Sequence, residues 1–193
     1  MSRLNYSILC EDKAHFTFIT TFLKSFAKKH HLQIKYNEDF FLRFKASNSK
    51  EVLKKFSAAA IIGFRDYQLD LLVIGIDYDD RDRDNFNSEI SKLYIQLDER
   101  FTDKSVIMFP VQAIEHWLLY IQYHLSNPTL TKNISFEQIS RKEAKVKIYG
   151  KKYSRNNQAL IKSLIDKLEV NWLISRSESF KRFYADLKNK LIR

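Results

Sequence analysis

The chain of 193 residues carries 33 lysines and arginines against 23 aspartates and glutamates, and 45% of its residues are hydrophobic. These values exclude a disordered chain and predict one globular domain with a substantial core. The single cysteine, Cys10, excludes an internal disulfide framework. The N-terminal residues do not resemble a signal peptide, and no apolar run is long enough to cross a bilayer, so a cytoplasmic protein is expected.

The first half of the chain alternates between strand and helix patterns. Residues 4–10 read as a short buried strand, and the apolar residues of 14–30 follow helical spacing. A second strand is predicted over 32–36. A helix follows, from an Asn/Ser cap at 47–49 to residue 64. Residues 69–76 form an apolar run typical of a central parallel strand buried on both faces.

The same alternation continues to residue 126 and then weakens. A helix is predicted over 85–100, a strand over 105–111 and a helix over 113–125. This order predicts an α/β fold with a mostly parallel central sheet flanked by helices. Residues 127–156 predict short helices or loops, and 157–170 and 177–192 predict two further helices. We therefore expect a single domain over 1–193, with an α/β core at 1–126 and a basic, mainly helical extension at 127–193.

The positive charge is concentrated in the extension. Residues 141–193 contain 15 lysines and arginines and 5 acids, whereas the other 140 residues hold 18 of each kind. A basic block of this kind is the usual footprint of a polyanion partner and predicts contact with nucleic acid. The alternative is a lysine-rich helix face that is simply solvated.

Acidic residues follow three of the predicted strands. Glu11 follows the first, Asp77 and Asp79 follow the third, and Glu115 lies just after the fourth. Ligand sites of open parallel sheets lie beyond the carboxyl ends of the strands. Residues two apart in an extended segment point to the same side, so Asp77 and Asp79 can converge. Oxygen ligands alone suit Mg²⁺ or Mn²⁺ rather than zinc.

Each acid has a structural alternative, as a turn residue, a helix cap or half of an ion pair. In the stretch LLVIGIDYDDRDRD, we assign the later acids Asp80, Asp82 and Asp84 to turns, or to pairs with Arg81 and Arg83. The convergence of acids from three strand ends favours a metal site over coincidence. The glycine-rich phosphate-binding motifs and a nucleophile elbow are absent from the sequence.

The segments ILCEDKAHFTFITTFLK, LLVIGIDYDD and FPVQAIEHWLL resemble the TOPRIM arrangement of topoisomerases, primases and overcoming-lysogenization-defect (OLD) nucleases. The signature of that arrangement is a strand ending in glutamate and a later strand ending in Asp-x-Asp. The chain resembles most the small stand-alone prokaryotic TOPRIM-like proteins of unknown function. Their Glu-x-Trp-Leu-Leu helix is read here as Glu115–Leu119, and their Ser-x-Ser-Phe-x-x-Phe motif as Ser177–Phe183.

The resemblance implies Mg²⁺- or Mn²⁺-dependent phosphodiester chemistry. Glu11 would be a metal ligand or general acid/base, Asp77 and Asp79 would bind the metal, and Glu115 would complete the site. In the segment KEAKVKIYGKK, Lys145 or Lys147 would stabilise charge on the phosphate. The implied ion activates water and neutralises charge in an in-line displacement.

The TOPRIM glutamate is usually followed by glycine, whereas Asp12 follows Glu11 in this chain. Asp12 either adds a metal ligand or disturbs the substrate pose. The first hypothesis is a nuclease, with DNA ahead of RNA as substrate and an ABC-type ATPase as partner in a prokaryotic antiphage defence system. The alternative is an inactive nucleic-acid-binding or complex-forming subunit. A third reading is a phosphatase or phosphotransferase of small phosphate esters, which would not depend on the basic extension.

Overall fold

The computed structural model describes residues 3–79, 83–129, 134–150 and 157–192, without the side chains of Arg83 and Asp84. In this part of the chain, the sheet consists of β1 (Leu4–Cys10), β2 (Ile34–Tyr36), β3 (Leu71–Gly75) and β4 (Ser105–Met108). The strand order is β2-β1-β3-β4, and all three pairings are parallel. The predicted α/β fold with a parallel central sheet is therefore confirmed.

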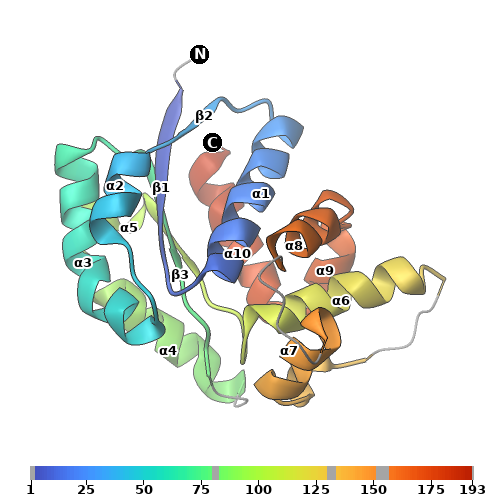
Figure 1. Ribbon diagram of the computed structural model, residues 1–193. Helices are drawn as coiled ribbons and strands as arrows, with labels where there is room; N and C mark the ends of the chain where they lie inside the picture. The colour runs from blue at the N-terminus through green and yellow to red at the C-terminus, as the bar shows by residue number, and fades with distance from the viewer. Residues whose placement is uncertain (1–2, 80–82, 130–133, 151–156, 193) are drawn as a thin grey trace.

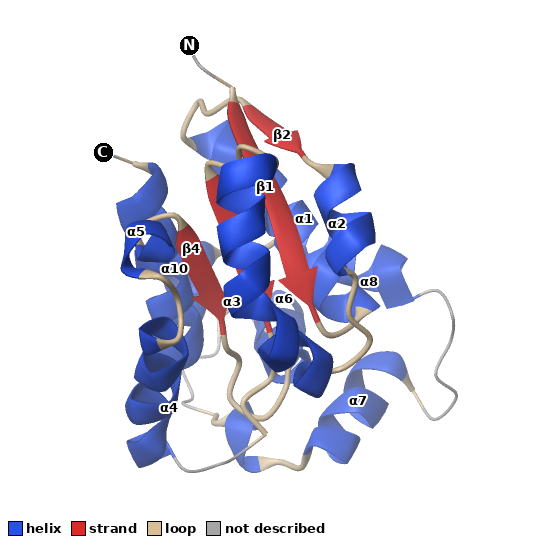
Figure 2. Cartoon of the chain, turned by 90° about the vertical axis from the view of Figure 1, so that its left-hand side faces the viewer, coloured by secondary structure: helices blue, strands red, loops and turns tan. Residues whose placement is uncertain are grey.

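Helices cover both faces of the sheet (Figure 1). One layer contains α1 (Lys13–Lys29), α6 (Ile114–Ser126), α8 (Asn157–Asp166), α9 (Val170–Arg176) and α10 (Glu178–Leu191). The other contains α2 (Glu38–Phe44), α3 (Ser49–Asp66), α4 (Arg83–Ile95) and α5 (Glu99–Thr102). The 3₁₀ turn η1 (Phe136–Gln138) and α7 (Arg141–Tyr149) complete the described elements. Figure 2 shows α7 below the carboxyl ends of the strands. None of the described helices is long and apolar enough to cross a membrane.

Two hydrophobic cores follow from the alternation of side chains along the strands. Tyr6, Ile8 and Cys10 of β1 face the layer of α1, while Leu9 faces the layer of α3. All five residues of β3 are buried, as expected for a strand covered on both faces.

The basic extension shares the first of these cores. Phe180 and Phe183 of α10 each lie 5.7 Å, between ring centroids, from Phe22 of α1. Both rings also contact Trp117 of α6 at 5.2 and 5.8 Å. Because α10 contributes fully buried aromatic side chains, the extension is packed into the fold and is not an appended tail.

Three local predictions differ from the structure. Helix α2 was not predicted, although Asn37 accepts a hydrogen bond from the Phe40 amide as a regular N-cap. The continuous helix over 85–100 was wrong, because the chain turns after α4 and Asp98 caps α5. Strand β4 ends at Met108 and not at 111, next to Pro110, which has no N–H to pair.

Strand β4 lies at an edge of the sheet, and side chains form hydrogen bonds to its backbone. Tyr94 of α4 accepts a hydrogen bond from the Ile107 amide at 3.1 Å and donates one to Asp186 of α10. Lys190 of α10 donates to the Ser105 carbonyl. Two of the backbone groups that an edge strand would expose are thus bonded within the chain, and these contacts also hold α10 against β4.

Replacing Tyr94 by phenylalanine should lower the free energy of unfolding by about 1–3 kcal/mol, because the Ile107 amide loses its acceptor. Urea unfolding measures this change. Tyr67→Phe is the matched control, since the Tyr67 hydroxyl only accepts a long 3.4 Å hydrogen bond from exposed Arg43. Equal effects of the two substitutions would contradict this role of Tyr94 at the edge strand.

Candidate functional site

The predicted acids lie together at the point in the sheet where the direction of the strand order reverses. The strand order places β1 beside β3, so the connections after these strands leave toward opposite edges. The carboxyl ends of strands at such a switch point form the usual ligand crevice of parallel α/β sheets. Glu11 lies there because its amide donates to the Gly75 carbonyl at 3.1 Å. Asp77 lies two residues beyond β3.

Asp77 also fixes the start of α6, which carries Glu115. Its Oδ1 atom accepts a hydrogen bond from the Ile114 amide at 2.9 Å, in a helix whose N-cap residue is Ala113. Alanine offers no capping group, so a carboxylate from β3 satisfies one of the free amides of the helix. This capping brings the first turn of α6, including Glu115, to the end of β3.

The backbone between β4 and α6 is held against the Asp-x-Asp segment. Tyr78 donates its amide to the Pro110 carbonyl at 2.8 Å, and its own carbonyl accepts from the Gln112 amide at 2.6 Å. Gln112 has a φ of 62°, which lets the chain turn sharply into α6. Asp77 and Asp79 flank the anchored Tyr78, and both contact Arg141.

His15, which the sequence analysis did not place in the site, lies fully buried between two carboxylates. Its Nδ1 atom is 2.9 Å from Asp12 Oδ1, and its Nε2 atom is 3.1 Å from Asp77 Oδ1. Burial lowers the pKa of His15, but the charges of Asp77 and Asp12 and their hydrogen bonds raise it well above its usual value. The imidazole is therefore a cation within the site.

Asp12 begins α1 as its N-cap. Its Oδ1 atom accepts from the His15 amide at 2.9 Å as well as from the ring. Burial raises the pKa of Asp12, but the hydrogen bonds and charge of His15 outweigh it and hold the pKa well below the usual range. The side chain is 39% exposed, so Asp12 stands at the rim of the site. An Asp-x-x-His spacing at a helix start was the signal that could have found this pair.

Arg141, at the start of α7, contacts three of the four predicted acids. One guanidinium nitrogen lies 2.8 Å from Asp77 Oδ2 and 3.5 Å from Glu11 Oε1, and the other forms an ion pair with Asp79. The sequence predicts Lys145 or Lys147 from this helix as the cation beside the phosphate, and not Arg141. Ser140 caps α7 in a Ser-x-x-Glu pattern, which marks Arg141 as its first residue, but the contact itself is long-range.

The two predicted lysines lie on different sides of α7. Lys145, one turn after Arg141, points to the site, with its Nζ atom 3.9 Å from Glu115 Oε1. Lys147 lies 3.5 Å from Glu143 of the same helix, and both side chains are 49% exposed. The structure thus brings Lys145 to the acids and leaves Lys147 away from them.

Several buried carboxylate oxygens accept no hydrogen bond in the described structure. They are Glu11 Oε1, Asp77 Oδ2 and Glu115 Oε2. Burial and the charge of Asp77 raise the pKa of Glu11 to about 8, and burial also raises the pKa of Glu115. Asp77 Oδ2 and Glu11 Oε1 are nevertheless ion-paired with Arg141, at 2.8 and 3.5 Å, so these buried acids are compensated by charge and not by regular hydrogen bonds.

Glu11, Asp12 and His15 offer one ligand atom each within 4.8 Å of one another, so this cluster could hold a metal ion. Both nitrogens of His15 are engaged by carboxylates, which leaves the acids as the better ligands. The predicted roles of Asp80, Arg81 and Asp82, and of the side chains of Arg83 and Asp84, fall outside the described residues.

Trp117 of the Glu115–Leu119 motif and the serines of the Ser177–Phe183 motif form a buried polar network and not a second site. The Trp117 indole donates to Ser179 at 2.9 Å, and Ser177 donates to Glu137 at 3.0 Å. Ser177 also lies 3.1 Å from Ser179 and caps α10 by accepting from the Phe180 amide at 3.2 Å. These contacts join α6 and α10. The two serines and the tryptophan therefore have a stabilising role in the core.

Comparisons of the chain with protein-family models, with curated proteins and with solved structures gave no match. A functional assignment therefore rests on the geometry of the site.

The raised pKa of Glu11 predicts a pH-dependent stability. Unfolded glutamate has a pKa of about 4.3, whereas folded Glu11 keeps its proton to about pH 8. Its stabilising contribution is thus complete below pH about 4 and is lost as the pH rises to about 8. Glu11→Gln cannot titrate, so its advantage over the wild type should grow between pH 5 and 8, by at most about 1.4 kcal/mol per pH unit.

Urea unfolding in EDTA across this range measures the difference, since the chelator removes any contribution of bound metal. Glu143→Gln, on the exposed side of α7, should show no such trend. A pH-independent difference between Glu11→Gln and wild type would contradict the raised pKa.

Proposed function

We propose that this protein is a TOPRIM-like, metal-dependent nuclease that hydrolyses phosphodiester bonds in nucleic acid, with DNA ahead of RNA as substrate. The carrying observation is the charge balance at the switch point. Five acids meet three cations: Glu11, Asp12, Asp77, Asp79 and Glu115 against His15, Arg141 and Lys145. With all groups ionised, the described side chains leave two negative charges, which one divalent cation would neutralise. While Glu11 keeps its proton, one negative charge remains, and binding of the cation would displace that proton.

The donor set fits Mg²⁺ or Mn²⁺. Glu11 and Glu115 each have a buried oxygen without a hydrogen bond, and Asp77 and Asp79 lie beside them, paired with Arg141. Hard cations of this kind prefer carboxylate oxygens. The bound ion would activate a water molecule and neutralise charge on the phosphate.

The residues of the chain itself support phosphoryl chemistry around such an ion. The Arg141 guanidinium presents several donors in one plane, a geometry that suits phosphate oxygens. Lys145 adds a second positive charge on the same face of α7. Glu11, with a pKa of about 8, can hold or release a proton near neutral pH, as a general acid or base must.

Asp12, which replaces the usual glycine of the TOPRIM pattern, has a structural role that is compatible with the proposed nuclease. It caps α1 and fixes His15, which in turn holds Asp77. Its negative charge is therefore offset by an adjacent cation where the polyanion would approach. The ATPase partner and the role in prokaryotic antiphage defence stay predictions.

A non-catalytic nucleic-acid-binding subunit is the second candidate, and one observation favours it. Arg141 and His15 already pair with most of the acids, so the charges of the chain partly replace those of a metal. The small-ester phosphatase is less well supported. It predicted no dependence on the basic extension, yet Arg141 and Lys145 reach the site from that extension.

Glu115→Gln tests the nuclease directly. The amide keeps the shape of the side chain but removes the charge that binds a cation, so cleavage should fall by about 100-fold. Plasmid, single-stranded DNA and single-stranded RNA would be incubated with Mg²⁺ or Mn²⁺, and binding would be followed in EDTA. The matched control Glu143→Gln removes the same charge from the exposed side of α7 and should cut like wild type.

Cleavage by Glu115→Gln at the wild-type rate would remove Glu115 from the site. If the wild type binds nucleic acid in EDTA but cuts none of these substrates with either metal, the binding subunit becomes the better assignment.

A further inference from the structure

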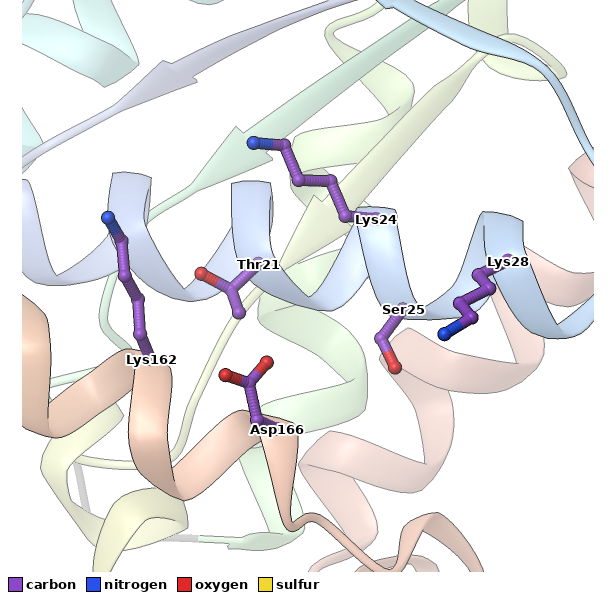
Figure 3. A pocket seen from close by; sticks show the side chains of 6 residues that line it. All are labelled: Thr21, Lys24, Ser25, Lys28, Lys162 and Asp166. Carbon is purple, nitrogen blue, oxygen red and sulfur yellow. The ribbon is translucent and has the colours of Figure 1, made fainter.

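A second polar site lies away from the acids, in a groove of about 460 Å³ between α1 and α8. Figure 3 shows its lining, in which Thr21 and Asp166 face each other and Lys162 rises from α8 beside α1. The described residues that line it are Thr21, Lys24, Ser25, Lys28, Lys162 and Asp166. None of them is aromatic or aliphatic, so the groove offers no surface on which a nucleobase could stack.

The three lysines of the groove are free to bind an anion. All are exposed, and none forms an ion pair with a described residue. Thr21 and Ser25 add two hydroxyl groups from the same helix. Against one acid, Asp166, the groove carries a surplus of two positive charges. Unpaired ammonium groups beside hydroxyls are the usual contacts to phosphate oxygens, which fix a strand without reading its sequence.

The positive potential extends beyond the groove toward the end of α1. Desolvation and the charges of Lys29 and Lys188 together lower the pKa of His30. Lys188 belongs to α10, so three helices of one layer contribute cations to this surface. Helix α1 connects it to the acids, since His15 lies in the first turn and Lys24 nine residues later. At about 1.5 Å per residue, this separation is about 14 Å along the helix.

We propose that the α1–α8 groove binds the sugar-phosphate backbone of a nucleic-acid strand, a few nucleotides from the acidic site. One strand of B-form DNA carries a phosphate every 3.4 Å or so of its axis. About 14 Å therefore corresponds to about four phosphates beyond the one at the acids. The inference names the substrate contact of the proposed nuclease and rests on that function only in taking nucleic acid as the ligand.

The first test removes the positive charges. Lys24→Gln/Lys28→Gln/Lys162→Gln would be compared with wild type for binding of labelled single- and double-stranded DNA and RNA in EDTA, over a range of salt. Binding should weaken at least tenfold. The slope of log Kd against log salt should fall by about two to three, one for each lost phosphate contact.

The matched control removes the same charge elsewhere. Lys35, Lys50 and Lys54 are exposed, form no ion pair with a described residue, and lie on the sheet edge or the opposite layer. Their triple glutamine variant should bind like wild type.

Asp166 gives a test in the opposite direction. Its carboxylate lies in the groove, so Asp166→Asn should tighten binding severalfold by removing repulsion of the phosphates. Asp103→Asn, at the exposed end of α5 in the opposite layer, makes the same charge change and should have little effect.

Three outcomes would each overturn the proposal. They are equal losses of affinity in the groove and control lysine variants, no tighter binding by Asp166→Asn, and no binding by the wild type. The two proposals fail separately. A protein that cuts, and whose groove variants bind normally, keeps the nuclease and loses the groove. A protein that binds through the groove without cutting loses the nuclease alone.

Discussion

The arrangement of the site depends on the Asp77 carboxylate. Its Oδ1 atom accepts a hydrogen bond from the Ile114 amide and lies beside His15, and its Oδ2 atom forms an ion pair with Arg141. One side chain thus joins β3 to α1, α6 and α7. A charge that is 1% exposed is tolerated only when its partners surround it, because desolvation costs several kcal/mol for an unpaired ion. The packing of three helices at this edge therefore depends on the Asp77 side chain.

The same principle explains how so many acids lie together in a basic protein. Arg141 and His15 offset part of the repulsion, and the raised pKa of Glu11 offsets more by keeping a proton. These compensations stop short of neutrality for the described groups. The remaining negative charge leaves the edge of the sheet able to hold an added cation, while the positive charge of the extension would attract the nucleic acid proposed as the partner.

Sequence patterns located the acids because the rules that place them are local. Buried parallel strands can be identified from their apolar composition, and their carboxyl ends lie at one edge of the sheet. Glu11, Asp77 and Glu115 could therefore be assigned to that edge. The cations were harder. His15 follows a local capping pattern that was readable but not used, whereas Arg141 reaches β3 across 64 residues of sequence. The Ser140 cap marks where α7 begins, but only the docking of α7 decides which of its basic side chains point inward.

The extension is consequently part of the site and not only a source of charge. Helix α7 supplies Arg141 and Lys145, and the chain on either side of it is fixed by buried contacts of Glu137 and Ser177 with the network around Trp117. Trp117 lies two residues after Glu115 on α6. A tryptophan that packs α10 and an acid that faces the site therefore share one helix turn. The aromatic core that holds the extension and the Glu115 side chain of the proposed site are therefore positioned by the same short helix.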